Sequence, residues 1–132
     1  MARKLKASEV ADYKEELMKA QGYKCPLCGG SLKMVKKINQ VLDHAHDTGF
    51  CRAVVCRGCN GMEGKVKNLI TTWGKAGDNP YYQRETLRRL LNYWDEHATP
   101  KTDVIYHKHK TAAEIREARN KKIRKTLTKG GK

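Results

Sequence analysis

Apolar residues along this 132-residue chain recur at spacings that predict mainly helices, with one central region of strands. The first predicted helix covers residues 8–21, with Ser8 as its N-cap and Gly22 as the residue that ends it. Its apolar residues share one face: Val10, Tyr13, Leu17 and Ala20. This face is expected to pack on whatever core the rest of the chain provides.

The central region contains the strand signals. Residues 31–43 suit one or two short strands around Asn39. Residues 50–55 suit another strand, which follows the turn signal Asp47-Thr48-Gly49. From Cys56 the pattern becomes helical again and continues to about Thr72.

Two more helices are predicted in the second half of the chain, after a loop at residues 74–80. One covers residues 83–97, and by default its apolar stripe covers the core: Leu87, Leu90, Leu91 and Trp94. The other is a basic helix at residues 112–127, beyond which residues 129–132 are expected to fray. We therefore expect an α+β, mostly helical chain with a domain at residues 1–100 and a basic arm at residues 101–132.

The net positive charge of the chain favours one class of binding partner. Lys and Arg number 28 against 14 Asp and Glu, so the net charge is +14 and the pI is near 9.7. Eleven of the basic residues lie in the last 32 positions, against three acids. Such clustering favours nucleic acid as the partner over mere solubility. No apolar run is long enough to span a membrane, and none follows Met1-Ala2-Arg3-Lys4, so neither a membrane anchor nor a secretory signal is expected.

Four of the five cysteines form two close pairs, Cys25-x-x-Cys28 and Cys56-x-x-Cys59. Four thiolates are a common tetrahedral set for structural zinc, and they leave no position open for chemistry. The 27 residues between the pairs exceed the spacing of simple zinc fingers, so a folded insert is expected there. Cys51 is expected to be a buried thiol, and reduced cysteines favour a cytoplasmic location.

The insert between the cysteine pairs carries the candidate chemistry. Asp43, His44 and His46 follow an apolar run; if residues 42–46 are extended, the two imidazoles share a face and Asp43 lies across from them. Asn60 and Glu63 come directly after the last cysteine, at helical spacing from it. These polar groups could be an exposed strand end, but zinc would hold the helix against the strands and make one rigid unit.

Taken together, these segments resemble the bacteriophage recombination endonuclease VII family, within the wider His-Me finger (HNH-like) nucleases. The likeness covers residues 20 to about 70 well and the 83–97 helix more loosely. It implies a zinc-bound ββα-metal core with flanking helices. It rests on five segments in a fixed order: Cys25-Pro26-Leu27-Cys28, Leu42-Asp43-His44-Ala45-His46, Thr48-Gly49, Arg52-Ala53-Val54-Val55-Cys56-Arg57-Gly58-Cys59-Asn60 and Glu63-Gly64.

The resemblance also implies a role for each residue of the cluster. Asp43 and Asn60 would hold a catalytic Mg²⁺, and His44 would be the general base that activates water. His46 would orient the scissile phosphate and Glu63 would support the metal site. The expected products carry 5′-phosphates, and the expected assembly is a homodimer acting on branched DNA such as Holliday junctions, in the host cytoplasm if the chain is encoded by a bacteriophage.

Basic residues are the candidates for DNA contact, because Lys and Arg neutralise phosphates without reading bases. Those beside the cluster are Arg52, Arg57 and Lys65. Those of the arm are Lys108, Lys110, Arg116, Arg119, Lys121, Lys122, Arg124 and Lys125.

Three other functions stay open from the sequence. The first is a general or nicking endonuclease that cuts linear duplex. The second is a non-catalytic zinc-ribbon nucleic-acid binder, which would need the cysteines and the basic surface but not the full set Asp43, His44, His46 and Asn60. The third is a zinc-bound protein-interaction module, which the net charge of +14 disfavours.

Overall fold

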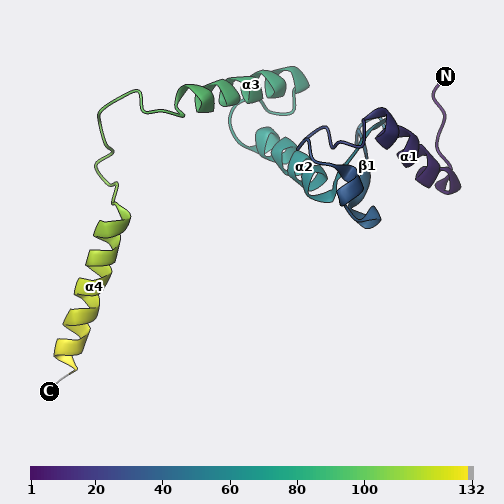
Figure 1. Ribbon diagram of the computed structural model, residues 1–132. Helices are drawn as coiled ribbons and strands as arrows, with labels where there is room; N and C mark the ends of the chain where they lie inside the picture. The colour runs from purple at the N-terminus through teal and green to yellow at the C-terminus, as the bar shows by residue number, and fades with distance from the viewer. Residues whose placement is uncertain (131–132) are drawn as a thin grey trace. The chain divides into compact units, whose positions relative to one another are not determined.

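A computed structural model describes residues 1–130 as two compact units, Met1–Arg88 and Arg89–Lys132. Residues 131 and 132, part of the segment expected to fray, lie outside the described residues. The order of elements confirms an α+β, mostly helical chain (Figure 1). The elements are three 3₁₀ helices at Ala7–Glu9, Leu32–Met34 and Lys37–Asn39, strands β1 (Gln40–His44) and β2 (Cys51–Cys56), and helices α1 (Val10–Ala20), α2 (Arg57–Thr72), α3 (Pro80–Glu96) and α4 (Ala112–Lys129).

The first helix ends as predicted but begins differently. Gly22 follows α1 with φ +62° and its N–H donates to the carbonyl of Lys19, which is the left-handed ending that glycine favours. Ser8 is not the N-cap. It lies inside the preceding 3₁₀ turn, where the Glu9 carboxylate accepts from the Lys6 N–H at 2.7 Å. A carboxylate that reaches back three residues has capped the turn in place of the serine hydroxyl.

The apolar run after residue 31 was expected to form strands, and for most of its length this prediction is wrong. Two 3₁₀ turns occupy it, and regular strand begins only at Gln40. Leu32 is fully buried, and the Gln40 side chain donates to its carbonyl at 2.9 Å. Tertiary burial and this side-chain contact therefore decide the local conformation, in place of strand propensity.

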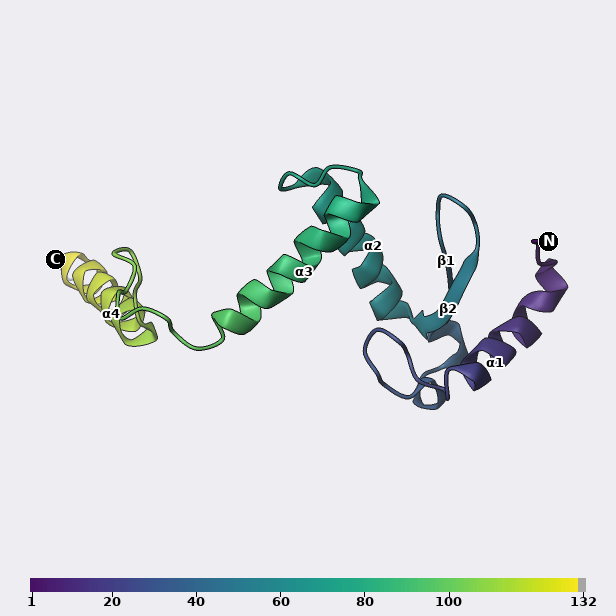
Figure 2. The same ribbon diagram turned by 90° about the horizontal axis from the view of Figure 1, so that it is seen from above.

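Strands β1 and β2 form an antiparallel hairpin that leads directly into α2 (Figure 2). Asp43 pairs with Ala53 and His44 pairs with Cys51, so β2 has one extra residue at this point, Arg52. A bulge of this kind disrupts the ladder locally and redirects the side chains around it. The polar end of β1 is therefore an irregular part of the sheet.

Helix α3 starts three residues earlier than the apolar stripe predicted. Asn79 caps it, since its side-chain oxygen accepts from the N–H of Tyr81 at 3.0 Å, and Pro80 stands at the first helical position. Gln83 is buried, and its amide donates to the Gly77 carbonyl at 2.6 Å and accepts from the Lys67 ammonium. These contacts tie the start of α3 to α2 within the first unit.

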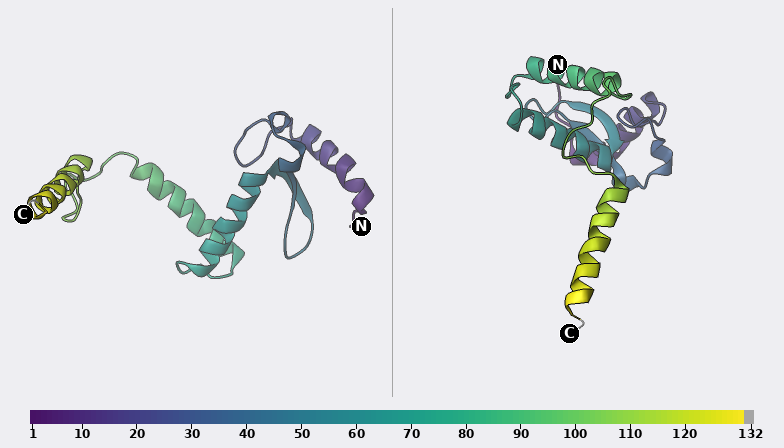
Figure 3. Two further views of the ribbon diagram at one scale, coloured as in Figure 1. Left: turned by 90° about the horizontal axis from the view of Figure 1, so that it is seen from below. Right: turned by 90° about the vertical axis from the view of Figure 1, so that its left-hand side faces the viewer.

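The core of the first unit is small, and α1 covers one side of β2 while α2 contacts both strands (Figure 3). Its buried residues are Met18, Cys25, Leu32, Val54 and Val55. The Gln21 amide accepts from the N–H of Val54 and donates to its carbonyl, both at 2.8 Å. A side chain at the end of α1 thus supplies β2 with the hydrogen bonds that a third strand would give.

The second unit contains the end of α3 and the basic helix α4. Thr111 and Glu114 form a reciprocal capping box at the start of α4, with both hydrogen bonds at 3.1 Å. The apolar stripe of α3 was expected to be core, but Leu91 and Trp94 are 56% and 60% exposed. Within residues 1–130, no helix is long and apolar enough to cross a membrane.

Candidate metal centres and active site

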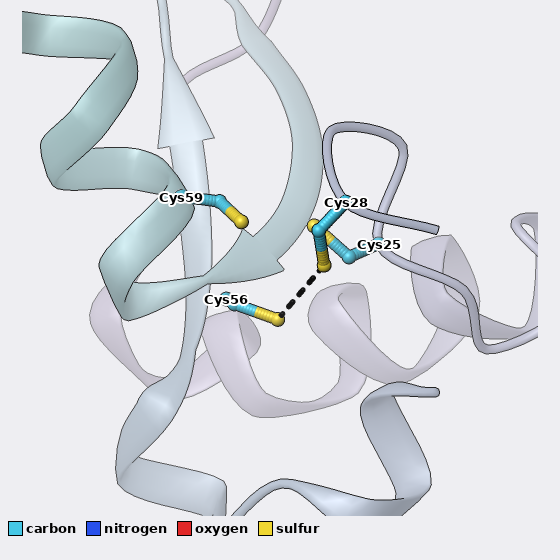
Figure 4. A group of neighbouring side chains, drawn as sticks. All are labelled: Cys25, Cys28, Cys56 and Cys59. Atoms are coloured by element: carbon cyan, nitrogen blue, oxygen red, sulfur yellow. Dashed lines mark hydrogen bonds between the residues drawn. The ribbon is translucent and has the colours of Figure 1, made fainter. Parts of the chain in front are cut away.

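The two cysteine pairs converge on one point. The sulfur atoms of Cys25, Cys28, Cys56 and Cys59 all lie within 4.8 Å of one another and face a common centre (Figure 4). The sulfurs of Cys28 and Cys56 are 3.9 Å apart. Four sulfurs at about 2.3 Å from a tetrahedral zinc ion lie about 3.8 Å from each other. The donor set and its spacing therefore fit one tetrahedral ion such as zinc.

Local backbone structure presents each pair of sulfurs. In the first pair, the N–H of Gly29 donates to the carbonyl of Cys25 at 2.8 Å, and the N–H of Gly30 points at the Cys28 sulfur at 3.4 Å. Gly29 has φ +73°, a conformation that glycine adopts without strain. In the second pair, Cys56 ends β2 as the N-cap residue of α2, and Cys59 lies within the first turn. The four cysteines thus join the turn at Cys25 and Cys28 to the end of β2 and the start of α2.

The thiol pKa values differ within the cluster. Burial alone raises the pKa of Cys25, but backbone N–H groups of Cys28, Cys56 and Leu27 outweigh it and lower the pKa to about 6. Burial and the neighbouring Cys28 thiol raise the pKa of Cys56 to about 11. Hydrogen bonding to Cys28, followed by burial, raises the pKa of Cys59 to about 12. Without a metal, Cys25 is the favoured site for the first negative charge.

A second polar centre lies where the hairpin meets α2. The Arg52 guanidinium donates to both oxygens of Asp43, from Nε to Oδ2 at 2.7 Å and from Nη2 to Oδ1 at 3.0 Å. The same Nη2 lies 3.3 Å from Oε2 of Glu63 on α2. The Asp43 side chain is only 13% exposed and that of Glu63 is 35% exposed. Two carboxylates from different elements thus share one cation.

The two histidines lie close together, although the backbone is not extended through them. Strand β1 ends at His44 and a turn starts at His46, so residues 42–46 do not meet the condition of extended backbone throughout. Their ring centroids are nevertheless 5.1 Å apart, and both side chains are exposed. His46 lines the same groove as Arg52 and Glu63, whereas His44 lines a hollow beside Leu42 and Cys51.

Asn60 lies one helical turn before Glu63 on α2 and is partly buried. None of the side-chain hydrogen bonds formed within residues 1–130 engages its amide. The helix therefore carries an amide and a carboxylate at neighbouring surface positions, in the stretch that starts at the cysteine cluster. Oxygen donors of this kind suit a hard divalent cation, so Asp43, Glu63 and Asn60 are the residues that could hold one.

A groove of about 770 Å³ extends from this centre along α2 to the start of α3. Its polar lining includes two cations that the sequence analysis did not single out, Lys67 and Arg84. Their charge alone could not separate them from the other 26 basic residues of the chain. Position one turn after Glu63 was the available signal for Lys67, whereas Arg84 required the tertiary fold.

Most of the other basic residues expected to contact DNA are exposed and form no ion pair that the structure records within residues 1–130. Arg57 and Lys65 are exposed on α2, and the candidates of the arm are exposed on α4 or in the loop before it. Arg52 is instead engaged by the two carboxylates. Cys51, expected to be buried, is partly exposed on β2 and lies outside the group of four converging sulfurs.

Comparison with known protein families gives a match over most of the chain. A family model described as recombination endonuclease VII matches residues 2–96. The matched stretch contains the four converging cysteines and the polar centre between the hairpin and α2.

Proposed function

The chain belongs to the recombination endonuclease VII family, and from this premise we propose that it is a magnesium-dependent endonuclease that hydrolyses phosphodiester bonds of branched DNA. Membership identifies an endonuclease whose substrate is DNA. Magnesium dependence, preference for Holliday junctions and 5′-phosphate products are the specific parts of the proposal. A general or nicking activity on linear duplex is the second candidate.

One observation supports the proposal most: carboxylates of Asp43 and Glu63, from different elements, converge on a single cation. Acids held this close repel each other unless a positive charge stands beside them. Asp43 and Asn60 would hold Mg²⁺ through oxygen atoms, with Glu63 in a supporting position. When bound, the ion would polarise the phosphate and stabilise negative charge on the leaving oxygen.

One of the two imidazoles would accept a proton from the attacking water, and the other would orient the scissile phosphate. His44 would accept a proton from the attacking water, since a neutral imidazole is a competent base near pH 7. His44 is exposed at the end of β1 and directly follows Asp43, which supports this role because water and a bound strand can reach its ring. His46, which lines the groove beside Glu63, would orient the scissile phosphate.

Zinc at the four cysteines would hold these elements in place. Cys56 and Cys59 lie at the junction of β2 with α2, and Asn60 follows immediately. Fixing that junction fixes the distance between the hairpin that carries Asp43 and the helix that carries Asn60. Catalytic geometry tolerates errors of about half an ångström, which a core of five buried residues needs help to maintain.

Charge supports DNA as the bound molecule. Lys67 and Arg84 line the groove next to the proposed active centre, and α4 carries seven Lys or Arg against two Glu. Phosphate contacts release counterions, so binding should weaken steeply as salt is raised. The exposed stripe of α3 supports a homodimer, in which each copy would cut one strand of a symmetric junction. The cytoplasmic location expected from the thiols stays a prediction.

Asn60→Ala provides the test of the active centre. The substitution removes an oxygen donor at a partly buried position of α2 and leaves the four cysteines in place, so DNA binding should be retained. Cleavage of a labelled DNA junction in Mg²⁺ should fall by about a hundredfold or more. Asn68→Ala, at an exposed position farther along the same helix, is the matched control and should cut normally.

Full cleavage by Asn60→Ala would remove this residue from the metal site and refute the proposed active centre. No cleavage by the unaltered protein on any DNA, with salt-sensitive binding retained, would favour the non-catalytic zinc-ribbon binder instead.

A further inference from the structure

Arg52 holds two residues of the proposed active centre at once. Its fork engages both oxygens of Asp43 and reaches Glu63 across to α2. An arginine guanidinium stays protonated in proteins, so Arg52 carries a full positive charge in this position. The proposed reaction so far gives this guanidinium no role.

A bulge in the β1–β2 hairpin places the Arg52 side chain beside Asp43. Arg52 is the extra residue of β2 opposite the step from Asp43 to His44. In a regular ladder, successive side chains point to opposite faces, so Arg52 and Ala53 would lie on different sides. Ala53 pairs with Asp43, so without the bulge Arg52 would lie on the face of the sheet opposite to Asp43. The bulge lets the Arg52 side chain reach the Asp43 carboxylate. The irregularity thus serves the contact between these two side chains.

The contact conflicts with metal binding at the same carboxylate. A bidentate guanidinium occupies the favoured acceptor directions of both oxygens. A divalent ion on Asp43 would then stand within a few ångströms of a second positive charge, which opposes its binding. The Arg52 side chain is 41% exposed, whereas Asp43 is 13% exposed, so the arginine is the partner that can move away.

We propose that Arg52 is a built-in counter-cation that neutralises Asp43 in the metal-free enzyme, and that a divalent ion must displace it. The displaced guanidinium then takes a phosphate of the bound DNA strand in the adjoining groove, since its fork fits phosphate as well as carboxylate. Metal and DNA therefore bind cooperatively, because each removes an obstacle to the other. Arg52 is a positioning residue in this scheme, which rests on the proposed function.

The test measures metal affinity directly. Zinc-loaded full-length protein is titrated with Mn²⁺, and free Mn²⁺ is followed by electron paramagnetic resonance. Arg52→Gln should bind Mn²⁺ about tenfold more tightly than the unaltered protein, because the competing cation is gone. Lys19→Gln is the control: it removes one positive charge at an exposed position on α1 and should change the affinity by less than about twofold.

The sign of the effect separates this role from a purely structural one. An ion pair that only holds Asp43 in place would weaken Mn²⁺ binding when removed, so unchanged or weaker binding by Arg52→Gln overturns the inference. Asp43→Asn tests the underlying site. Loss of Mn²⁺ binding in that variant keeps the proposed metal site, whereas unaffected binding refutes both the site and the inference.

A second titration tests the coupling to DNA. With His44→Ala added to both proteins to block cutting, Mn²⁺ affinity is measured again in the presence of a DNA duplex. The difference in Mn²⁺ affinity between the protein that keeps Arg52 and the Arg52→Gln variant should shrink, because phosphate draws the guanidinium away from Asp43. A difference that stays the same or grows contradicts the transfer of Arg52 to DNA.

Discussion

At the scale of single residues, two side-chain amides form structural hydrogen bonds that the spacing of apolar residues does not predict. Gln21 closes hydrogen bonds to both backbone groups of Val54, which is fully buried. Gln83 is 3% exposed and joins α2 to the loop before α3. Both positions are polar, and neither spacing nor composition predicts that they are structural. Their role depends on partners distant in sequence, up to 33 residues away.

Gln21→Ala should destabilise the first unit by about 2 kcal/mol, because the N–H and carbonyl of buried Val54 would lose a partner each. Thermal unfolding followed by circular dichroism measures the change. Lys19→Ala, at an exposed position on the same helix, is the control and should alter stability by less than about 0.5 kcal/mol. Equal stability of the two variants would mean that solvent replaces the Gln21 amide without cost.

The candidate site illustrates what residue patterns can and cannot supply. Asp43 and Glu63 were singled out from sequence, and the structure brings them to one guanidinium. The part played by Arg52 was not predictable, because it depends on a bulge, and one extra residue in a strand leaves no periodic signal. The catalytic roles of Asp43, His44, His46, Asn60 and Glu63 stay predictions.

At the scale of elements, the helices were predicted better than the central strands. The second strand and α2 were placed to within one residue, and the spacing of the cysteine pairs predicted their convergence. The conformation of the stretch between Leu32 and Asn39 was not predicted correctly, since short apolar runs are compatible with strands and with buried turns alike. Burial of Leu32 selects the turns, and burial is a property of the assembled fold.

Removal of zinc should loosen the junction of β2 and α2. Cys28→Ser removes one of four ligands, so we expect cooperative unfolding of the first unit to be lost or to shift strongly downward, as with chelation of the metal. Cys51→Ser is the matched control, because Cys51 lies outside the group of converging sulfurs. An unchanged melting curve for Cys28→Ser would contradict the structural role of the metal.

Metal uptake by the cysteine cluster should also release protons. The pKa values of Cys56 and Cys59 are about 11 and about 12 without metal, so both thiols are protonated at about pH 8, whereas a zinc-bound sulfur is a thiolate. Two or more protons should therefore appear per zinc bound, and affinity should rise with pH. Calorimetry in buffers of different ionisation enthalpy measures the number, and a value near zero would contradict these pKa shifts.

At the scale of the whole molecule, composition and motif order predicted the family, and the match over residues 2–96 confirms it. The net charge of +14 pointed to nucleic acid before any fold was considered. What composition could not predict is where the apolar stripe of α3 goes. Within the second unit, Leu91 and Trp94 of this stripe are exposed.

A second copy of the chain is the partner that we expect for this stripe. Sedimentation velocity should give a dimer for the unaltered protein and a monomer for Trp94→Asp, because a charge cannot be buried in an apolar interface. Trp73→Asp is the control, since Trp73 is also exposed but lies outside the stripe. A monomer at all concentrations would contradict the homodimer and would leave the proposed active centre unaffected.

The most direct test of the central claim is cleavage of a labelled four-way DNA junction beside matched linear duplex, with and without Mg²⁺. We predict paired, magnesium-dependent cuts near the branch that disappear in His44→Ala and persist in His107→Ala, whose histidine is exposed in the second unit. Equal cutting of linear duplex would keep the endonuclease and discard the junction preference. Unimpaired cutting by His44→Ala, or cutting without a divalent ion, would contradict the proposed catalytic roles of His44 and of the metal.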